Sequence, residues 1–482
     1  MEKQKNRVAL HNLGCKVNAY ETEAMGQLLR EAGYMTVPFE EEADVYLVNT
    51  CSVTNMADRK SRQMLHRARK KNPKAVVVAA GCYVQAQAEE ILKEGTADLI
   101  IGNNQKSRLV ELLSQFLEKR QERLEAVIDI AHTEEYERLS IRQTTEHTRA
   151  FIKIQDGCNQ FCSYCIIPYT RGRIRSRRPE DLLDEAKRLA GAGYQEVVLT
   201  GIHLSSYGKD FEQPISLLEI LGRLEEVEGI RRIRLGSLEP RIVTEEFVAG
   251  LASMKQVCPH FHLSLQSGCD ETLKRMNRHY TTADYAACCE RLRKYYTDPA
   301  ITTDIIVGFP GETEEEFLKT LSFLRQIGLS EMHIFKYSRR QGTKAAAMAG
   351  QVPEEVKTKR SHQAMLLEKE MARNFRQRFE GKQRELLLEE KQEIGGKRYL
   401  VGFTKEYVKA AVCMDRLDQR EAALLVPGRM IPTTLLGETE TEGRGLLLAT
   451  PVSSFFDGFP AEQVRESEET GRKPLDSPVN LY

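Results

Sequence analysis

Three short apolar segments near the N-terminus each end in a cysteine and lead into a helix-like stretch. They span residues 8–15, 44–51 and 75–82, and a fourth segment, 98–101, ends at Gly102. Strands that alternate with helices at this spacing predict a parallel sheet, whose strands end at one common edge. We therefore expect Cys15, Cys51 and Cys82 to converge at that edge, at helix starts that favour thiolates.

A second strand–helix series begins at Phe151. Polar residues and glycines follow its strands, which is where a (β/α) barrel places its chemistry. The spacing predicts a barrel, complete or partial, with six strands at Phe151–Gln155, Glu196–Thr200, Arg232–Gly236, His260–Gln266, Thr303–Val307 and Glu331–Tyr337.

The sequence changes character after a long charged helix predicted at Pro353–Glu380. Short β-like runs separated by glycine and proline turns then predict a small all-β barrel. The end of the chain lacks periodicity and is predicted to be disordered. In a chain of 482 residues we expect an α/β domain at 1–115, a linker at 116–147, the (β/α) barrel at 148–378, the small β-barrel at 379–451 and a tail at 452–482.

Composition limits the class of protein but indicates no binding partner. Lys+Arg and Asp+Glu each number 70, so net charge gives no evidence for nucleic acid. The sequence has no apolar run of membrane-spanning length and no signal peptide, so we expect a cytoplasmic protein with no membrane association. In that compartment its 11 cysteines are predicted to be metal ligands, catalytic groups or buried apolar side chains rather than disulfides.

The densest chemical signal is the run Cys158-x3-Cys162-x2-Cys165, directly after the first strand of the predicted barrel. Structural zinc sites usually take four ligands, and no further Cys or His follows within the next 35 residues. Three thiolates suit a 4Fe–4S cluster with one iron left unligated. The pattern favours the cluster, with zinc as the alternative.

This run resembles the signature of the radical S-adenosylmethionine (radical SAM) superfamily. The resemblance implies that the open iron chelates the methionine part of the cofactor, and that the reduced cluster cleaves it to a 5′-deoxyadenosyl radical. Motifs in the same order after the cysteines resemble the family's cofactor contacts, although each one alone also fits an ordinary turn or core position. They imply as cofactor-binding residues Tyr164, Thr200, Gly201, Ser264, Gln266, Asp304 and Gly308.

The segments Leu13–Asn18, Asn49–Val53 and Ala80–Tyr83 resemble motifs of the methylthiotransferases within that superfamily. The resemblance covers about residues 7–450. It implies a multidomain α/β protein: a flavodoxin-like parallel N-terminal domain, a partial (β/α)6 radical-SAM barrel and a C-terminal all-β barrel like the RNA-binding TRAM module.

The same resemblance implies two 4Fe–4S clusters. The first is held by Cys15, Cys51 and Cys82, and the second, which binds S-adenosylmethionine, by Cys158, Cys162 and Cys165. Three unrelated buried cysteines are the simpler alternative for the first set. We assign no catalytic side chain beyond the cluster ligands, because the C–H bond that such enzymes attack is not acidic enough for general-base catalysis.

Basic residues cluster after Cys51 and again after Cys165. Such clusters suit phosphate contact, although a solvated basic face is the commoner explanation. The predicted RNA-binding residues are Arg62, Arg69, Lys70, Arg171, Arg173 and Arg175. In the small β-barrel, Phe403 and Tyr407 are possible base-stacking residues, with a place in the core as the alternative.

Among the tRNA-modifying enzymes of the family, the motif Leu-Gly-Cys-Lys-Val-Asn around Cys15 is most similar to the branch that acts on N6-threonylcarbamoyladenosine, and less similar to the isopentenyladenosine branch. That branch adds a methylthio group to C2 of N6-threonylcarbamoyladenosine at position 37, beside the anticodon. The implied partners are tRNA, an electron donor such as flavodoxin or ferredoxin, and a sulfur donor. The alternatives are methylthiolation of isopentenyladenosine in tRNA, methylthiolation of a ribosomal-protein aspartate, and a non-catalytic metal-stabilised RNA-binding protein.

Overall fold

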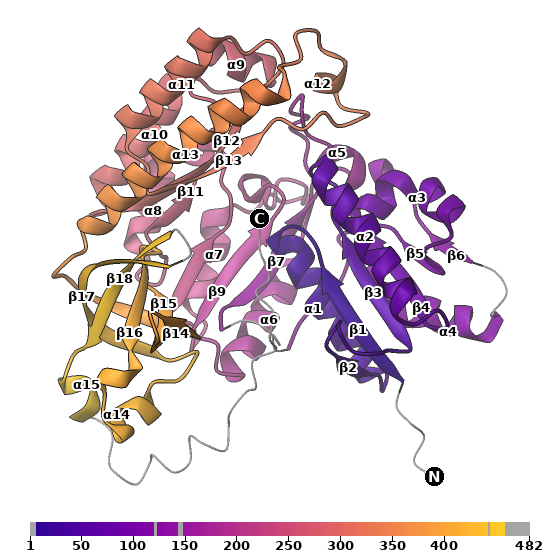
Figure 1. The fold of residues 1–482 in the computed structure, drawn as a ribbon, viewed down its shortest axis with the longest axis horizontal. Coiled ribbons are helices and arrows are strands. Elements are labelled where there is room, and N and C mark those ends of the chain that lie inside the picture. The colour runs from indigo at the N-terminus through magenta and orange to yellow at the C-terminus, as the bar shows by residue number, and fades with distance from the viewer. Residues whose placement is uncertain (1–5, 120–122, 143–147, 442–443, 458–482) are drawn as a thin grey trace.

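The computed structural model describes residues 6–119, 123–142, 148–441 and 444–457. Three parts follow one another along the chain: a parallel α/β domain, an open barrel of strands covered by helices, and a small closed β-barrel (Figure 1). The fold class predicted from the sequence is confirmed. Most of the predicted tail, residues 458–482, lies outside the described residues, and its first part contains a short helix, α15 (Ser454–Asp457).

The N-terminal domain is a six-stranded parallel sheet in the order β2-β1-β3-β4-β5-β6. Its strands are β1 (Arg7–Asn12), β2 (Met35–Val37), β3 (Val45–Thr50), β4 (Val76–Gly81), β5 (Leu99–Ile101) and β6 (Leu124–Ala126). Helices α1 (Lys16–Glu31) and α4 (Leu109–Lys119) cover one face, and α2 (Asn55–Lys71) and α3 (Cys82–Glu94) cover the other. The sequence missed β2 and β6, because three residues show no periodicity. Since β6 joins this sheet, the domain extends beyond the predicted boundary at residue 115.

The central barrel consists of two sheets. One has the order β10-β9-β7-β8, and the other the order β11-β12-β13. Their strands are β7 (Ala150–Asp156), β8 (Arg175–Ser176), β9 (Glu196–Gly201), β10 (Arg232–Leu235), β11 (His260–His262), β12 (Ala300–Val307) and β13 (Glu331–Lys336). Isolated bridges such as Leu238 to Leu263 join the two sheets beside β10 and β11. Within the described residues no pairing joins β13 to β7 or β8, so the barrel is open on that side.

Helices cover the outside of the barrel (Figure 1). The longer ones are α6 (Pro179–Gly191), α7 (Leu217–Glu225), α8 (Glu245–Ser253), α10 (Thr282–Tyr295), α11 (Glu314–Ile327) and α13 (Glu354–Gln377). Shorter helices follow strands or cysteine loops: α5 (Ile167–Thr170), α9 (Asp270–Arg275) and α12 (Lys344–Ala347). None of the described helices is long and apolar enough to cross a membrane.

The C-terminal barrel closes in the order β14-β15-β16-β18-β17. Its elements are β14 (Gln383–Ile394), β15 (Lys397–Phe403), β16 (Lys409–Cys413), α14 (Gln419–Leu424), β17 (Met430–Thr441) and β18 (Arg444–Pro451). It docks on the amino ends of the central strands. There the Tyr407 ring stacks on His260 with centroids 4.4 Å apart, and the Phe403 ring stacks on Tyr407 at 4.5 Å. The two rings are therefore occupied in a domain interface, which supports a structural role for them rather than base stacking.

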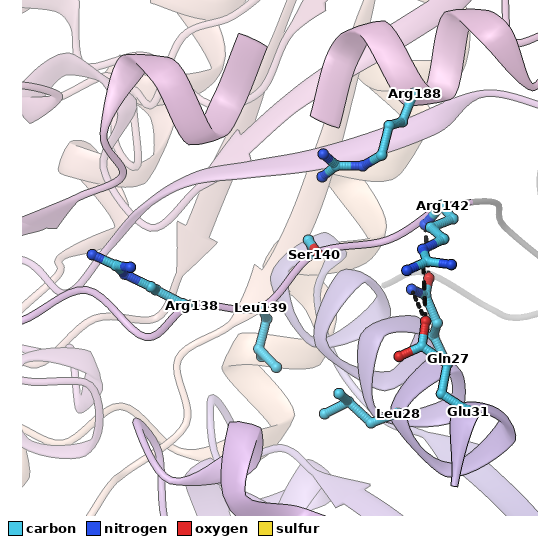
Figure 2. Close-up of a pocket in the computed structure, with 8 residues that line it drawn as sticks. All are labelled: Gln27, Leu28, Glu31, Arg138, Leu139, Ser140, Arg142 and Arg188. Atoms are coloured by element: carbon cyan, nitrogen blue, oxygen red, sulfur yellow. Dashed lines mark hydrogen bonds and ion pairs between the residues drawn. The ribbon is translucent and has the colours of Figure 1, made fainter. Parts of the chain in front are cut away.

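A pocket of about 310 Å³ marks the seam between the N-terminal domain and the barrel (Figure 2). It lies among the end of α1, the connecting segment 138–142 and α6. Arg142 pairs with Glu31 across it at 3.6 Å. The pocket contains none of the predicted site residues.

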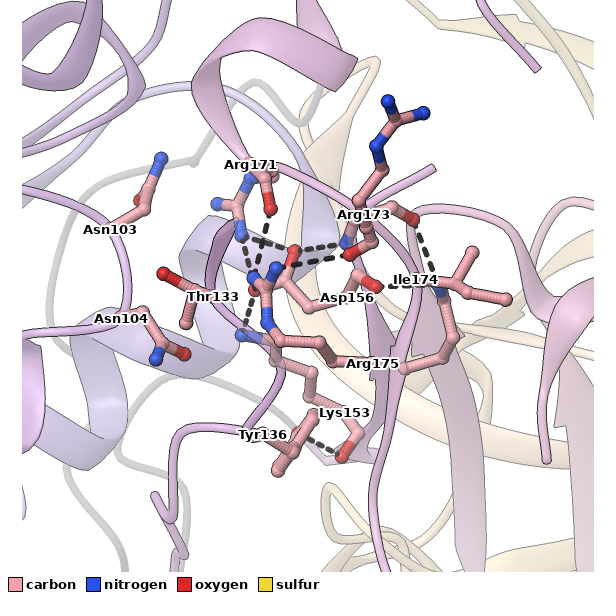
Figure 3. Close-up of polar contacts among 12 residues, drawn as sticks. Asn103, Asn104, Thr133, Tyr136, Lys153, Asp156, Arg171, Arg173, Ile174 and Arg175 are labelled. Atoms are coloured by element: carbon pink, nitrogen blue, oxygen red, sulfur yellow. Dashed lines mark hydrogen bonds and ion pairs between the residues drawn. The ribbon is translucent and has the colours of Figure 1, made fainter. Parts of the chain in front are cut away.

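A buried ionic network joins the two domains. Figure 3 shows its members from the barrel, Lys153, Asp156 and Arg171. Glu21 of α1 accepts from Lys153 of β7 at 2.6 Å and from Arg171 at 2.9 Å, and it also pairs with Lys106. Asp156, at the end of β7, lies 2.6 Å from the same Lys153 ammonium. Although burial raises the pKa of both carboxyls, the surrounding cations, Arg171 first, bring it below the usual range.

Contacts at the other edge of the open barrel complete the junction. Arg340, which follows β13, pairs with Asp58 of α2 at 2.5 Å and donates to the Ser52 hydroxyl at 2.7 Å. The N-terminal domain thus contacts both free edges of the barrel and covers its open side.

Replacement Glu21→Gln is expected to reduce the free energy of unfolding by about 3–5 kcal/mol, because it leaves buried cations without their carboxylate. Urea unfolding of the purified protein measures this. The matched control is Glu219→Gln, which breaks an exposed pair with Arg223 of 2.6 Å and is expected to cost no more than about 0.5 kcal/mol. Equal effects of the two replacements would contradict the role given to the network.

Candidate metal and cofactor centre

The first cysteine trio lies at the carboxyl edge of the N-terminal sheet, as predicted. Cys15 follows β1, Cys51 follows β3 and Cys82 begins α3 after β4. The three thiols lie close enough to influence one another: burial, then Cys82 and Cys15, raise the pKa of Cys51 to about 12. Burial is the largest cause, and Cys51 lies three residues before Thr54, the N-cap of α2, rather than at the helix start that the sequence predicts.

Two asparagines tie the loops of this trio together. The Asn18 amide donates to the carbonyl oxygens of Leu13 and Thr50 at 2.7 and 3.0 Å, which holds the segments before Cys15 and Cys51 side by side. The Asn103 amide lies 3.5 Å from the Cys82 sulfur. The spacing of the trio is thus built into the fold.

Gly14 explains why the chain can bring Cys15 so close to Cys51. Its φ of +103° suits glycine, and a Cβ at this position would lie 2.7 Å from the Cys51 sulfur. Any side chain here would enter the space between the first two cysteines.

The second trio lies in the loop after β7. The backbone N–H of Gln160 is 3.5 Å from the Cys158 sulfur, and the Arg278 guanidinium donates to the Cys162 sulfur at 3.2 Å. Burial, the largest cause, raises the pKa of Cys158 to about 11. Arg278 thus places a positive charge directly against one sulfur of this trio.

Neither trio has the geometry of a single zinc ion. A tetrahedral zinc with Zn–S bonds of about 2.3 Å brings its sulfurs to about 3.8 Å from one another. Among the described residues, the group of three metal-binding atoms within 4.8 Å of one another is His262, Asp304 and His333, with no cysteine. The wider cysteine trios fit a cluster that carries several irons, whose positive charge would ionise the buried thiols.

Most of the predicted cofactor-binding residues lie at the carboxyl ends of the barrel strands. Gly201 ends β9 after the buried Thr200, Ser264 and Gln266 follow β11, and Gly308 follows β12.

Contacts link these strand ends to the second trio. Arg278 donates both to the Ser264 carbonyl, at 3.3 Å, and to Cys162. Tyr164 packs edge-on against Phe309 with ring centroids 6.4 Å apart. Arg278 was missed from the sequence, since nothing in its surroundings marks an arginine as a partner of a cysteine 116 positions away.

Asp304 differs from the other predicted cofactor contacts. It lies inside β12 rather than after it, and its carboxylate is 3.4 Å from the His262 imidazole. Asp304 therefore belongs to the inner surface of the barrel.

Two of the predicted RNA-binding arginines are internal (Figure 3). Arg171 is fully buried and bonds to Glu21, to Asp156 and, at 2.6 Å, to the Asn18 side chain. Arg175 is fully buried and donates to the carbonyl oxygens of Arg171 and Arg173 at 2.8 and 3.0 Å. Neither guanidinium is available to a phosphate, so the prediction that these two arginines bind RNA is wrong.

The other four basic residues reach the surface to different degrees. Arg173 is exposed, with its guanidinium 4.6 Å from the Phe161 ring centroid, and Lys70 is exposed on α2. Arg62 is partly buried and donates to the Tyr83 hydroxyl at 3.1 Å. Arg69 is partly buried and pairs with Asp98 at 2.5 Å, which makes it the least available of the four.

Comparison with known proteins now identifies the family. Residues 152–324 match the Radical SAM superfamily, and residues 7–102 match a family described as Uncharacterized protein family UPF0004. Over 404 residues the chain is 43% identical to the threonylcarbamoyladenosine tRNA methylthiotransferase MtaB of Bacillus subtilis (strain 168), covering 83% of this chain and 89% of that relative. The chain belongs to the radical SAM methylthiotransferase family.

Two further comparisons relate this methylthiotransferase to a second tRNA-modifying enzyme and to a solved structure. It is 39% identical to a tRNA-2-methylthio-N(6)-dimethylallyladenosine synthase of Caldicellulosiruptor saccharolyticus, over 78% of this chain and 80% of that relative. The solved structure of the radical S-adenosylmethionine methyltransferase TsrM from Kitasatospora setae shares the fold, with a TM-score of 0.51 and 16% identity over 69% of this chain and 73% of that one. Membership of the radical SAM superfamily implies a 4Fe–4S cluster and S-adenosylmethionine.

Proposed function

We propose that this methylthiotransferase adds a methylthio group to C2 of N6-threonylcarbamoyladenosine at position 37 of tRNA. The observation that carries the proposal is the pairing of two three-cysteine sites across one buried junction. Arg171 binds Asn18, which spaces the loops of the first trio, and also Asp156, which lies two residues before Cys158. The named activity of the Bacillus subtilis relative, the more similar of the two methylthiotransferases compared, supports the choice of substrate.

The proposed site holds two clusters, one on Cys15, Cys51 and Cys82 and the other on Cys158, Cys162 and Cys165. When bound at the second cluster, S-adenosylmethionine supplies the methyl group and the radical. The chain orients it through the residues at the strand ends, Tyr164, Thr200, Gly201, Ser264, Gln266 and Gly308. Arg278 donates to the Cys162 sulfur and holds the Ser264 backbone beside it.

The surface next to the second trio suits RNA. Tyr169 is 47% exposed, its ring lies 5.8 Å from that of Phe161, and Arg173 covers Phe161. Exposed aromatic and guanidinium groups in this arrangement can stack with a splayed base or contact a phosphate. We assign Arg173, Lys70 and Arg62 to tRNA binding. An electron donor such as flavodoxin or ferredoxin and a sulfur donor complete the proposed partners, and a tRNA substrate places the reaction in the cytoplasm.

Deletion of the gene is expected to abolish 2-methylthio-N6-threonylcarbamoyladenosine in cellular tRNA and to leave the parent nucleoside, because only the C2 substitution depends on this enzyme. Mass analysis of tRNA nucleosides measures both, and complementation with the intact chain should restore the product. Loss of the methylthio-isopentenyl nucleoside, or of a methylthio group on a ribosomal protein, would overturn the proposed substrate.

The reconstituted protein is expected to bind about eight irons, four for each cluster. Replacing Cys158, Cys162 and Cys165 by alanine should halve the iron and abolish cleavage of S-adenosylmethionine to 5′-deoxyadenosine. Replacing Cys15, Cys51 and Cys82 should also halve the iron, but should leave some cleavage and no methylthio product. Full product from the second variant would refute the role of the first trio.

Gly14→Ala is expected to remove iron from the first cluster, because its Cβ would lie 2.7 Å from the Cys51 sulfur. We would measure it in the background lacking Cys158, Cys162 and Cys165, where all bound iron reports on the first trio. Gly33→Ala is the matched control, since Gly33 also has positive φ, +90°, but its Cβ would meet no atom within 4 Å. Iron content that falls equally in both variants would show backbone strain rather than a contact at the trio.

A further inference from the structure

Three neighbouring strands bring two imidazoles and a carboxylate together inside the barrel. Metal-binding atoms of His262 (β11), Asp304 (β12) and His333 (β13) lie within 4.8 Å of one another, and the two imidazole rings stack with centroids 6.0 Å apart. On the same strands, the alternate residues Phe261 and Ile305 are fully buried in the core. Because successive side chains of a strand point to opposite faces, the His–Asp–His group faces the barrel interior.

Lys16 approaches this group from the other domain. It directly follows Cys15 and begins α1, the helix that lies beside β7 on the covered side of the barrel (Figure 1). Its ammonium forms no hydrogen bond or ion pair with any described residue. It nevertheless acts on the barrel: against the effect of burial, His262, His333 and Lys16 lower the pKa of Asp304. Lys16 thus adds a positive charge, unpaired among the described residues, within electrostatic reach of the His–Asp–His group.

The nucleosides named for the related enzymes differ in the chemical group that the adenosine carries on N6. A threonylcarbamoyl group carries a carboxylate, a hydroxyl and an N–H, whereas a dimethylallyl group carries only hydrocarbon. An apolar group placed here would leave the Lys16 ammonium unpaired and partly desolvated, which is costly. A carboxylate would give the ammonium its partner and form a charge-assisted hydrogen bond.

We propose that Lys16, together with the His333 imidazole, binds the carboxylate of the threonylcarbamoyl group, and that Asp304, held by His262, accepts from its N–H or hydroxyl. This subsite rests on the proposed function and deepens it, since it selects threonylcarbamoyladenosine over isopentenyladenosine. It reassigns Asp304 from the cofactor to the substrate. A site built from hydrogen-bonding groups rejects a ligand that lacks them far more strongly than an apolar pocket rejects a small polar group.

A divalent cation is the competing occupant, because two histidines and one carboxylate form a familiar set of metal ligands. The Lys16 ammonium opposes it, since a second positive charge would sit beside the first. The test below therefore includes a metal analysis.

The test compares two anticodon stem-loop RNAs on the fully reconstituted enzyme, one with N6-threonylcarbamoyladenosine and one with its methyl ester. The ester removes the negative charge and changes little else. We expect the wild-type enzyme to bind the acid about 10- to 100-fold more tightly, the range for a hydrogen bond to a charged group. Fluorescence anisotropy gives both dissociation constants without turnover.

Lys16→Met is expected to abolish this preference by weakening binding of the acid and leaving binding of the ester unchanged, while Lys16→Arg should retain much of it. Lys93→Met, at an exposed lysine of α3, is the matched control and should keep the full preference. His333→Gln gives a second route to a reduced preference. Iron content and melting temperature are measured for each variant, so that loss of the first cluster is not mistaken for loss of the subsite.

Equal binding of acid and ester by the wild-type enzyme would overturn the subsite, as would an equal loss of both RNAs in Lys16→Met. A tightly bound divalent ion beyond the cluster irons, removed by His333→Gln and kept by Lys16→Met, would also overturn it in favour of a metal site. If the enzyme methylthiolates the acid stem-loop without preferring it, only the subsite fails. If it methylthiolates only an isopentenyl stem-loop, the proposed function fails.

Discussion

The buried charges of Glu21, Lys153, Asp156 and Arg171 hold the chemistry of this protein in place. Arg171 touches the first trio through Asn18 and the second through Asp156, so one guanidinium spans both sites. In a partly open barrel, no strand pairing among the described residues joins the domains across the open side. The relative position of the two cysteine trios therefore depends on side chains, and removal of any one of these buried charges would leave the others without a partner that they need.

The surroundings of the cysteines make them good ligands only when a cation is present. Burial raises the pKa of Cys51 to about 12 and that of Cys158 to about 11, so ionisation of either thiol calls for a compensating positive charge. Metal binding and ionisation are thus coupled. Asn103 and Arg278 then contribute direction and charge at individual sulfurs.

The two flanking domains cover different parts of the central barrel. The C-terminal barrel closes the amino ends of the strands with the Tyr407–His260 stack, while the N-terminal domain covers the open side. We propose that the cofactor binds at the carboxyl ends of the strands, near Arg173 and Tyr169 on the surface. The interior between them is polar, with Lys16, His262 and Asp304, and this polarity is the physical basis for expecting a charged substituent on the substrate.

The sequence by itself determined the parallel N-terminal sheet, the positions of all six cysteines after strands, the six barrel strands and the family, because these depend on local periodicity and on short motifs. Tertiary structure decided the rest. Arg171 and Arg175 look like phosphate ligands in the sequence, yet folding buries them against Glu21, Asp156 and backbone carbonyls from distant or neighbouring segments. Lys16 and His333 lie 317 positions apart, so no pattern along the chain relates them. The function of a charged side chain depends on the groups that pack around it. For a residue at a domain interface, those groups come together only when the two domains are folded and docked.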